Sequence, residues 1–268
     1  MGLGRALTQE LCHRGARVVF AARSADKLRE VADRLIASGI SSDAVLPFPA
    51  DLTNPEDRAD LLEYTSEAFD GALDLAINNA GIGAYGRFES HDETITRRLF
   101  EINVLALMEM CRGVLPLLRR GHRPALCNIG SVVGRRGLPG RSEYSASKFA
   151  VAGFTEAIRA EWARDRIDVL LLNPGFTATE FEKNLLVDTA IYKTDQRRTM
   201  TASSVALATL HALEQGRSEV TLSLPGRLLL LVNRISPRFV DWGLSRWTKR
   251  LYADSAALAR VESPARSL

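Results

Sequence analysis

Short runs of consecutive apolar residues recur along the chain and alternate with segments in which apolar residues stand three or four positions apart. The runs are typical of parallel strands covered on both faces, and the spaced segments are typical of amphipathic helices. This alternation predicts an α/β protein built around a parallel sheet. The expected strands are at 17–22, 44–49, 73–77, 125–129, 167–173 and 219–224.

The first element of this pattern is a helix rather than a strand. Gly4 leads directly into an amphipathic segment that ends at Gly15, and the buried strand at 17–22 follows. A helix that leads into such a strand is the second half of a strand–helix–strand unit, so we expect the strand before it to be missing. We attribute this to a start codon that lies upstream or to a truncated gene. The alternative is a fold that manages without the strand.

The composition excludes several classes of function. The 268 residues carry a net charge of +3, which does not indicate nucleic-acid binding. The three cysteines and four histidines show no metal-binding or redox spacing, so we expect no metal site and a reducing compartment. No signal peptide opens the chain and no apolar run approaches the ~20 residues of a membrane span, so we expect a cytoplasmic protein.

The most informative stretch for chemistry lies between Gly130 and Lys148. Tyr144 and Lys148 stand four apart in a helical pattern, so their side chains leave the same face. A free tyrosine, with a pKa near ~10, is a poor acid–base catalyst at neutral pH, and a nearby ammonium lowers that pKa. Ser131 follows the strand at 125–129 and could place a hydroxyl beside a carbonyl oxygen. The alternative for Tyr144 and Lys148 is an ordinary helix pair.

The scarcity of lysine favours a chemical role for Lys148. Lysine occurs only at positions 27, 148, 183, 193 and 249, while nearly every other cation is an arginine. The planar fork of arginine cannot replace a compact ammonium that passes on protons.

The order of Ser131 and then Tyr144-x-x-x-Lys148, thirteen residues later, resembles the short-chain dehydrogenase/reductase family. The resemblance runs from Gly2 to about Leu224, and six motifs fall in the family's order. It implies that residues 1–225 form a single Rossmann-like domain, a doubly wound parallel sheet that lacks its usual first strand. In the family that strand lies between the strands expected here at 17–22 and 73–77. Residues 226–268 form an extension.

The resemblance also implies roles for individual residues. Ser131 binds the substrate carbonyl, Tyr144 exchanges its proton, and Lys148 lowers the tyrosine pKa and holds the nicotinamide ribose. Asn103 matches a fourth catalytic residue and holds a water that links Lys148 to solvent; the alternative is a satisfied core amide. The residues implied in cofactor binding are Gly2, Leu3, Gly4, Arg23, Asp51, Leu52, Asn79, Ala80, Gly81, Tyr144, Lys148, Pro174, Gly175, Thr177 and Thr179.

Two positions bear on the cofactor. Gly2 and Gly4 match the last two glycines of a dinucleotide-binding turn, whose threonine and first glycine are absent here. Arg23 closes the second expected strand, and a cation at this place favours the extra phosphate of NADP over NAD. We therefore expect NADP(H), with NAD(H) as the second possibility. The alternative for Arg23 is a solvated surface side chain.

These observations predict an NADP(H)-dependent oxidoreductase that interconverts a carbonyl and an alcohol. The apolar content of residues 180–200, a lid over the substrate, hints at a bulky apolar substrate. A catalytically silent nucleotide-binding or scaffold protein is the alternative, because the dinucleotide cradle is incomplete. A serine hydrolase fits poorly, since Ser131 stands in Gly-Ser-Val-Val-Gly and no histidine is placed to serve it.

The segment 226–252 departs from the family pattern. Its apolar residues include Trp242 and Trp247, and its six cations face a single acid, Asp241. A basic amphipathic segment with tryptophans can lie on an anionic membrane surface. The alternative is a helix that covers the substrate pocket or joins subunits. Homodimers or homotetramers are expected because the family commonly forms them.

Overall fold

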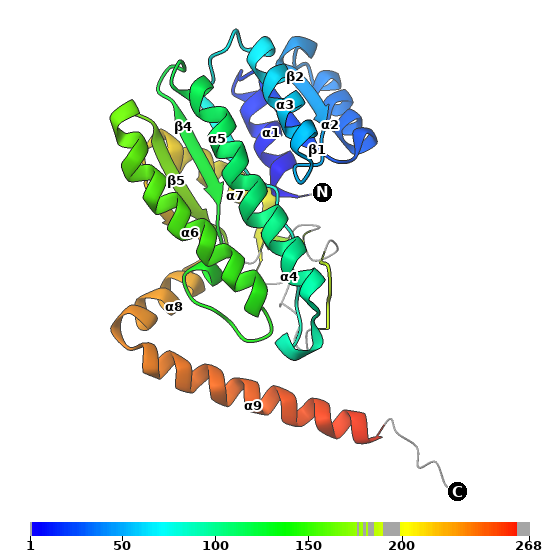
Figure 1. Ribbon diagram of the computed structural model, residues 1–268, viewed down its shortest axis with the longest axis vertical. Helices are drawn as coiled ribbons and strands as arrows, with labels where there is room; N and C mark the ends of the chain where they lie inside the picture. The colour runs from blue at the N-terminus through cyan, green and yellow to red at the C-terminus, as the bar shows by residue number, and fades with distance from the viewer. Residues whose placement is uncertain (1, 176, 179–180, 182–184, 190–198, 262–268) are drawn as a thin grey trace, which may run out of the picture.

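Parallel strands form the centre of the protein, and helices cover both faces (Figure 1). The computed structural model describes residues 2–175, 177–178, 181, 185–189 and 199–261. The strands are β1 (Val18–Ala22), β2 (Val45–Pro49), β3 (Leu75–Asn78), β4 (Ala125–Ile129), β5 (Asp168–Asn173), β6 (Thr177–Ala178), β7 (Met200–Thr201) and β8 (Glu219–Thr221). The helices are α1 (Leu3–His13), α2 (Ala25–Ala37), α3 (Pro55–Ala68), α4 (Glu93–Phe100), α5 (Ala106–Leu118), α6 (Ser142–Trp162), α7 (Ala202–Glu214), α8 (Leu224–Ile235) and α9 (Pro237–Val261).

The described parallel strands fall into three sheets. β1 pairs with β2, while β3, β4, β5 and β8 pair in that order, and the short strands β6 and β7 pair with each other. Within the described residues, no strand pairs with the second edge of β1 or of β3. Both strands line a single cavity of about 1660 Å³, together with side chains of α1, α3 and α5. The sequence-based expectation of a gap between these two strands is confirmed.

Helix boundaries follow the capping residues in the sequence. The Asn54 side chain accepts a hydrogen bond from the amide of Glu56, and Pro55 occupies the first turn of α3. Ser24 caps α2 with its side chain, which accepts a hydrogen bond from the amide of Lys27. A π-helical segment, Glu101–Leu105, separates α4 from α5. Such interruptions are rare and often mark functional sites.

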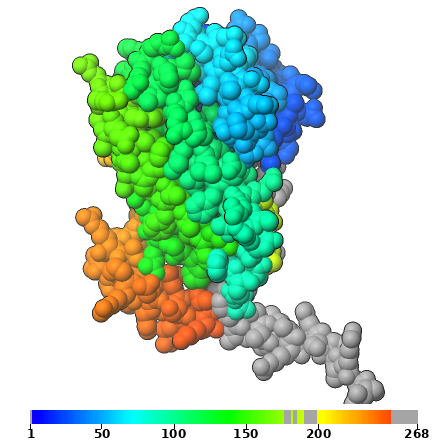
Figure 2. Space-filling view, viewed as in Figure 1, coloured from blue at the N-terminus to red at the C-terminus, as the bar shows by residue number. Residues whose placement is uncertain are grey.

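The C-terminal helices α8 and α9 lie at the lower end of the molecule (Figures 1 and 2). α8 begins at Leu224, so the domain boundary expected between 225 and 226 falls within its first turn. Across the described part of the chain, no helix is both long enough and apolar enough to span a bilayer.

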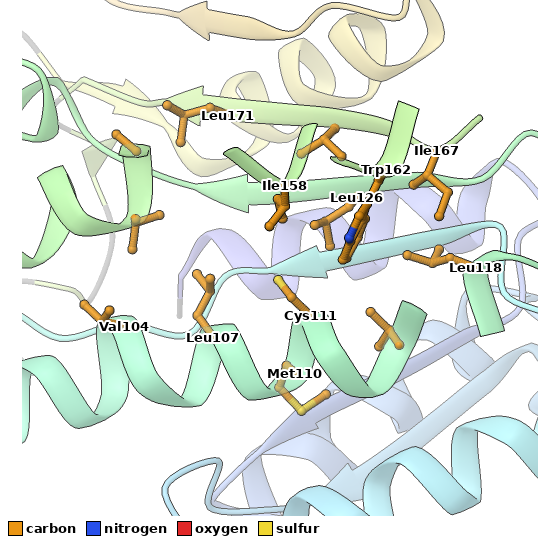
Figure 3. Close-up of a cluster of buried hydrophobic side chains, with 14 of the residues drawn as sticks. Val104, Leu107, Met110, Cys111, Leu118, Leu126, Ile158, Trp162, Ile167 and Leu171 are labelled. Carbon is orange, nitrogen blue, oxygen red and sulfur yellow. The ribbon is translucent and has the colours of Figure 1, made fainter. Parts of the chain in front are cut away.

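The two faces of the sheet are packed by alternating side chains. Val169 and Leu171 of β5 join Leu126 of β4 in the core beneath α5 and α6 (Figure 3). Leu170 and Leu172 point to the opposite face, where they pack against α7. All five side chains are almost completely buried, which explains the uninterrupted apolar runs in the sequence.

A chain of buried hydrogen bonds crosses this apolar core. The Asn78 amide donates to the Asn128 carbonyl oxygen at 2.9 Å, and the Asn128 amide donates to the Thr155 hydroxyl at 3.0 Å. These bonds connect β3, β4 and α6, so the last residue of β3 is joined to the neighbouring strand and to the helix that covers it.

Candidate active site

Ser131, Tyr144 and Lys148 line the same cavity. Ser131 comes two residues after the end of β4 and caps a short turn, where its hydroxyl accepts a hydrogen bond from the amide of Val133. Tyr144 and Lys148 lie in the first two turns of α6, and both are buried. The strand end and the helix start therefore bring together three residues that stand at most seventeen positions apart in the sequence.

The α6 helix is held close to the turn that follows Ser131. A Cβ atom built on Gly134 would lie 2.7 Å from the backbone carbonyl oxygen of Lys148. Real Cβ atoms do not come this close to backbone, so only glycine lets the turn approach the helix here.

Burial dominates the ionisation of Tyr144. It raises the pKa of the phenol well above its ordinary value, and the neighbouring Tyr85 raises it further. A hydrogen bond with Ser131 and the positive charge of Arg141 lower the same pKa. The expected lowering by Lys148 is not among these effects.

The position of Lys148 explains why it is not among the effects on the Tyr144 pKa. Its ammonium lies 6.0 Å from the centroid of the Tyr144 ring and donates a hydrogen bond to the backbone carbonyl of Ile129 at 2.8 Å. Burial lowers the pKa of Lys148 to about 8. An amine with this pKa exchanges protons readily near neutral pH, which suits the relay expected from the sequence.

Asn103 lies in the π-helical segment and does not line the cavity. Its side chain accepts a hydrogen bond from the Ile82 amide and donates one to the Ile82 carbonyl, both at 2.9 Å. It also donates to the Ser147 hydroxyl at 3.0 Å, and that hydroxyl donates to the Tyr144 backbone carbonyl. Asn103 thus positions the catalytic turn of α6, and its water-holding role stays a prediction.

The same cavity is lined by most of the residues expected to bind a dinucleotide. These are Gly2, Leu3, Gly4, Arg23, Asp51, Leu52, Asn79, Ala80, Gly81, Pro174 and Gly175. The N-cap residue of α1, Gly2, makes no side-chain capping hydrogen bond. A Cβ atom on Gly4 would lie 2.7 Å from the side-chain amide nitrogen of Asn79, so a larger residue here would displace that side chain.

Two further residues expected at this site are Thr177 and Thr179. The backbone of Thr177 lies in β6, which pairs with β7. Thr179 lies outside the described residues.

Asp51 is already engaged by its neighbour. The backbone amide and the hydroxyl of Thr53 donate to its carboxylate at 3.0 and 2.8 Å, and these bonds lower its pKa. The charge of Arg23 lowers it further, which places Arg23 near this corner of the cavity.

The C-terminal helices border the cavity as well. Leu229 of α8 and Leu244 and Trp247 of α9 line it on the side of Ser131. This agrees with one alternative from the sequence, a C-terminal segment that covers the substrate pocket.

Residues 1–189 match the family described as short chain dehydrogenase. The chain belongs to this family. Members of the short-chain dehydrogenase family are NAD(P)-dependent oxidoreductases, so the chain is an oxidoreductase of this kind.

Two relatives in the family resemble nearly the whole chain. One is named ketoacyl reductase HetN, from Nostoc sp.; it is 30% identical over 253 residues, which cover 92% of this chain and 85% of the relative. Another, from Anopheles gambiae, is named dehydrogenase/reductase SDR family protein 7-like; it is 28% identical and covers 93% of this chain and 81% of its own.

Solved structures share the fold. A short-chain dehydrogenase/reductase from Burkholderia phymatum in complex with NAD has a TM-score of 0.77 at 24% identity, covering 87% of this chain and 89% of its own. An alcohol dehydrogenase from Thermococcus sibiricus, complexed with 5-hydroxy-NADP, has a TM-score of 0.72 at 23% identity and covers 82% of this chain and 91% of its own.

The sequence analysis missed the residues that surround the Tyr144 ring. The Tyr85 and Phe181 rings lie 6.2 and 5.6 Å from it, centroid to centroid, and the Arg141 guanidinium lies 4.0 Å from the Tyr85 centroid. They come from three separate loops, so no local spacing signals them. Their proximity to Tyr144 depends on how the loops fold.

A buried contact between His91 and Glu143, at the start of α6, was missed for the same reason. His91 Nδ1 lies 2.8 Å from a carboxylate oxygen of Glu143, and both side chains are almost completely buried. The pair fixes the first turn of α6 against the loop before α4. A single signal was available in the sequence, since Glu143 directly precedes Tyr144.

Replacing Lys148 with methionine should stabilise the fold in a pH-dependent way. The folded lysine titrates near 8 and the unfolded one near its ordinary 10.5, so the unfolded chain binds more protons between these values. The free energy of unfolding of the wild type therefore rises with pH between these two values. The penalty for burying the charged Lys148 is fully present below pH 8. We expect Lys148→Met to raise the free energy of unfolding at pH 7 by up to ~3 kcal/mol, less the lost hydrogen bond.

Denaturant unfolding between pH 7 and 10.5 measures this effect, and the exposed Lys249→Met is the control. The advantage of Lys148→Met should shrink as the pH rises. A constant difference at all pH values would contradict a depressed lysine pKa.

Proposed function

We propose that this short-chain dehydrogenase is an NADP(H)-dependent carbonyl reductase and alcohol dehydrogenase that acts on an apolar substrate in the cytoplasm. The observation that carries the proposal is a single cavity with Ser131, Tyr144 and Lys148 at one end and the uncapped N-terminus of α1 at the other. The name of the Nostoc relative, a ketoacyl reductase, supports the reaction type.

The cavity residues fit a nicotinamide dinucleotide. The start of α1, whose residues line the cavity, suits a diphosphate, because a helix N-terminus binds anions. Asp51 with Leu52 would hold the adenine, and Lys148 the ribose. The nicotinamide would lie against Pro174 and Gly175, with Thr177 and Thr179 at its carboxamide. When bound, the cofactor supplies or accepts the hydride.

The catalytic residues handle the proton and the oxygen. In the reductive direction the Tyr144 hydroxyl gives its proton to the carbonyl oxygen, and in the oxidative direction the phenolate takes the alcohol proton. The Ser131 hydroxyl donates a hydrogen bond to the same oxygen. Lys148, whose pKa of about 8 lies near neutrality, returns a proton toward Tyr144. Asn103 keeps the helical turn between these residues in place.

The charge near the adenosine end supports NADP(H) over NAD(H). Arg23 is exposed, lines the cavity and affects the ionisation of Asp51. Lys27, in the first turn of α2, lines the same region. Two cations at one corner favour a ligand with an additional phosphate.

The walls near Tyr144 support an apolar substrate. Ile82, Val133, Leu138 and Phe181 line the cavity beside the phenol and belong to the same cluster of hydrophobic side chains. Burial against such a surface favours a substrate with a hydrocarbon portion.

We also propose that the enzyme forms a homodimer or homotetramer, as is common in the family. Its contact with membranes would be peripheral, through residues 226–252.

Replacing Tyr144 with phenylalanine tests the proposed acid. The change removes one hydroxyl and keeps the ring, so NADPH affinity should stay within about threefold while turnover falls by about 10²–10⁴-fold. NADPH fluorescence measures binding, and NADPH oxidation with a panel of ketones measures turnover. Tyr64→Phe, in α3 away from the cavity, is the matched control. Unchanged turnover in Tyr144→Phe would refute the assignment, and a wild type that binds no NADPH would favour the silent scaffold.

Replacing Arg23 with serine tests the cofactor preference. A charged phosphate contact contributes roughly 1.5–3 kcal/mol, so kcat/KM with NADPH should fall about 10–100-fold while the value with NADH changes little. Arg29→Ser, an exposed arginine of α2 that does not line the cavity, should leave both values unchanged. Equal losses with NADPH and NADH in Arg23→Ser would contradict recognition of the extra phosphate.

A further inference from the structure

The helices α8 and α9 carry a group of large exposed apolar side chains, which we call the apolar stripe. Each of its members is more than half exposed: Leu224, Leu228, Leu231 and Ile235 on α8, and Phe239 and Trp242 on the start of α9. The four on α8 recur every three or four positions, so they lie along one side of that helix, and α9 begins two residues after the last of them. So many large exposed apolar side chains on two neighbouring helices indicate a contact surface.

Cations accompany the apolar stripe. Arg227, Arg234, Arg238, Arg246 and Lys249 are all exposed. Between 224 and 249 the sequence contains one acid, Asp241, and its carboxylate pairs with Arg136 from another segment. The Arg246 guanidinium lies 5.2 Å from the centroid of the Trp242 ring, so charge and apolar surface are in direct contact. The face is complementary to an anionic layer with an apolar interior.

The inward face of the same helices belongs to the active site. Leu229, Leu244 and Trp247 line the cavity that contains Tyr144. Arg136, in the loop that connects Ser131 to α6, donates a hydrogen bond to the Asn233 side chain of α8 at 3.0 Å. It also pairs with Asp241 of α9. The helices that carry the stripe are therefore joined to the catalytic loop and border the substrate end of the cavity.

We propose that the apolar stripe binds the surface of an anionic membrane and that the cavity takes its carbonyl substrate from that membrane. An amphipathic helix with arginines beside leucines and aromatic residues lies in the plane of the lipid headgroups. Docking in this orientation leaves only α8 and α9 between the bilayer and the substrate end of the cavity. The substrate half of the proposal rests on the proposed reductase function, whereas the docking half does not.

Charge argues against a second copy of the chain as the occupant. Two copies that met stripe to stripe would bring ten cations together with two acids, both already paired with Arg136. Like charges at short range oppose such a contact, whereas anionic lipid headgroups favour it.

Vesicle co-sedimentation of the full chain tests the docking. The probes are vesicles of phosphatidylcholine alone and vesicles with about one-third phosphatidylserine, at low and high salt. We expect binding to the anionic vesicles only, weakened by salt. The double substitution Leu231→Ser and Phe239→Ser should lower the partition coefficient about tenfold or more, because neither residue lines the cavity and both are exposed. Leu207→Ser, an exposed leucine of α7, is the matched control.

Several results would overturn the docking. One is a wild type that stays in solution with anionic vesicles, and another is an equal loss in Leu207→Ser. A wild-type oligomer that the double substitution dissociates, with no vesicle binding, would show that a second copy covers the stripe.

A kinetic comparison tests the source of the substrate. NADPH oxidation is followed with a long-chain methyl ketone dissolved in anionic vesicles and with a short water-soluble ketone. The double substitution should reduce the rate with the vesicle-borne ketone about tenfold and leave the rate with the soluble ketone unchanged. Equal rates of both variants with the vesicle-borne ketone would overturn the substrate half. No turnover of either ketone by the wild type would contradict the proposed reductase function and leave the docking result standing.

Discussion

The exclusion of water from Tyr144 and Lys148 is the constraint on which the site depends. Burial opposes the charged form of each group, raising the pKa of the phenol and lowering that of the amine. A buried polar group is tolerated only where hydrogen bonds replace its water. The carbonyl of Ile129 accepts a hydrogen bond from Lys148, and the hydroxyl of Ser131 forms one with Tyr144. Asn103 holds the helical turn between them through a hydrogen bond to Ser147. The same isolation strengthens the influence of each nearby charge, Arg141 included.

The α/β architecture explains why these groups meet. Parallel strands bring the loops at their carboxyl ends to one edge, where ligands bind in this class of fold. Ser131 follows β4, Asn79 to Gly81 follow β3, and Pro174 with Gly175 follow β5. The gap between β1 and β3 extends the cavity into the sheet. The part of the cavity that the start of α1 lines therefore borders the unpaired edges of these two strands, within the described residues. The C-terminal helices α8 and α9 also line the cavity, and their exposed side chains include the apolar stripe and its neighbouring cations.

The sequence predicted those features that local pattern controls. Buried strands such as β4 and β5 are apolar on both faces, and Tyr144 with Lys148 share a helix face by spacing alone. Tertiary effects escaped it. The π-helical segment at Glu101–Leu105 and the loops that bring Tyr85 and Arg141 to the phenol have no local signature. The burial of Tyr144 and the hydrogen bond from Lys148 to the carbonyl of Ile129 are likewise properties of the folded chain.

Ionisation of the Tyr144 phenol tests the account most directly. Ultraviolet difference titration of wild type against Tyr144→Phe isolates this one tyrosine in the protein without added nucleotide. The account predicts a pKa clearly above the ~10 of free tyrosine, and a further rise when Arg141 is replaced with methionine. A Tyr144 pKa at or below ~10 that Lys148→Met raises and Arg141→Met leaves unchanged would contradict it, because the amine rather than burial would then control the phenol.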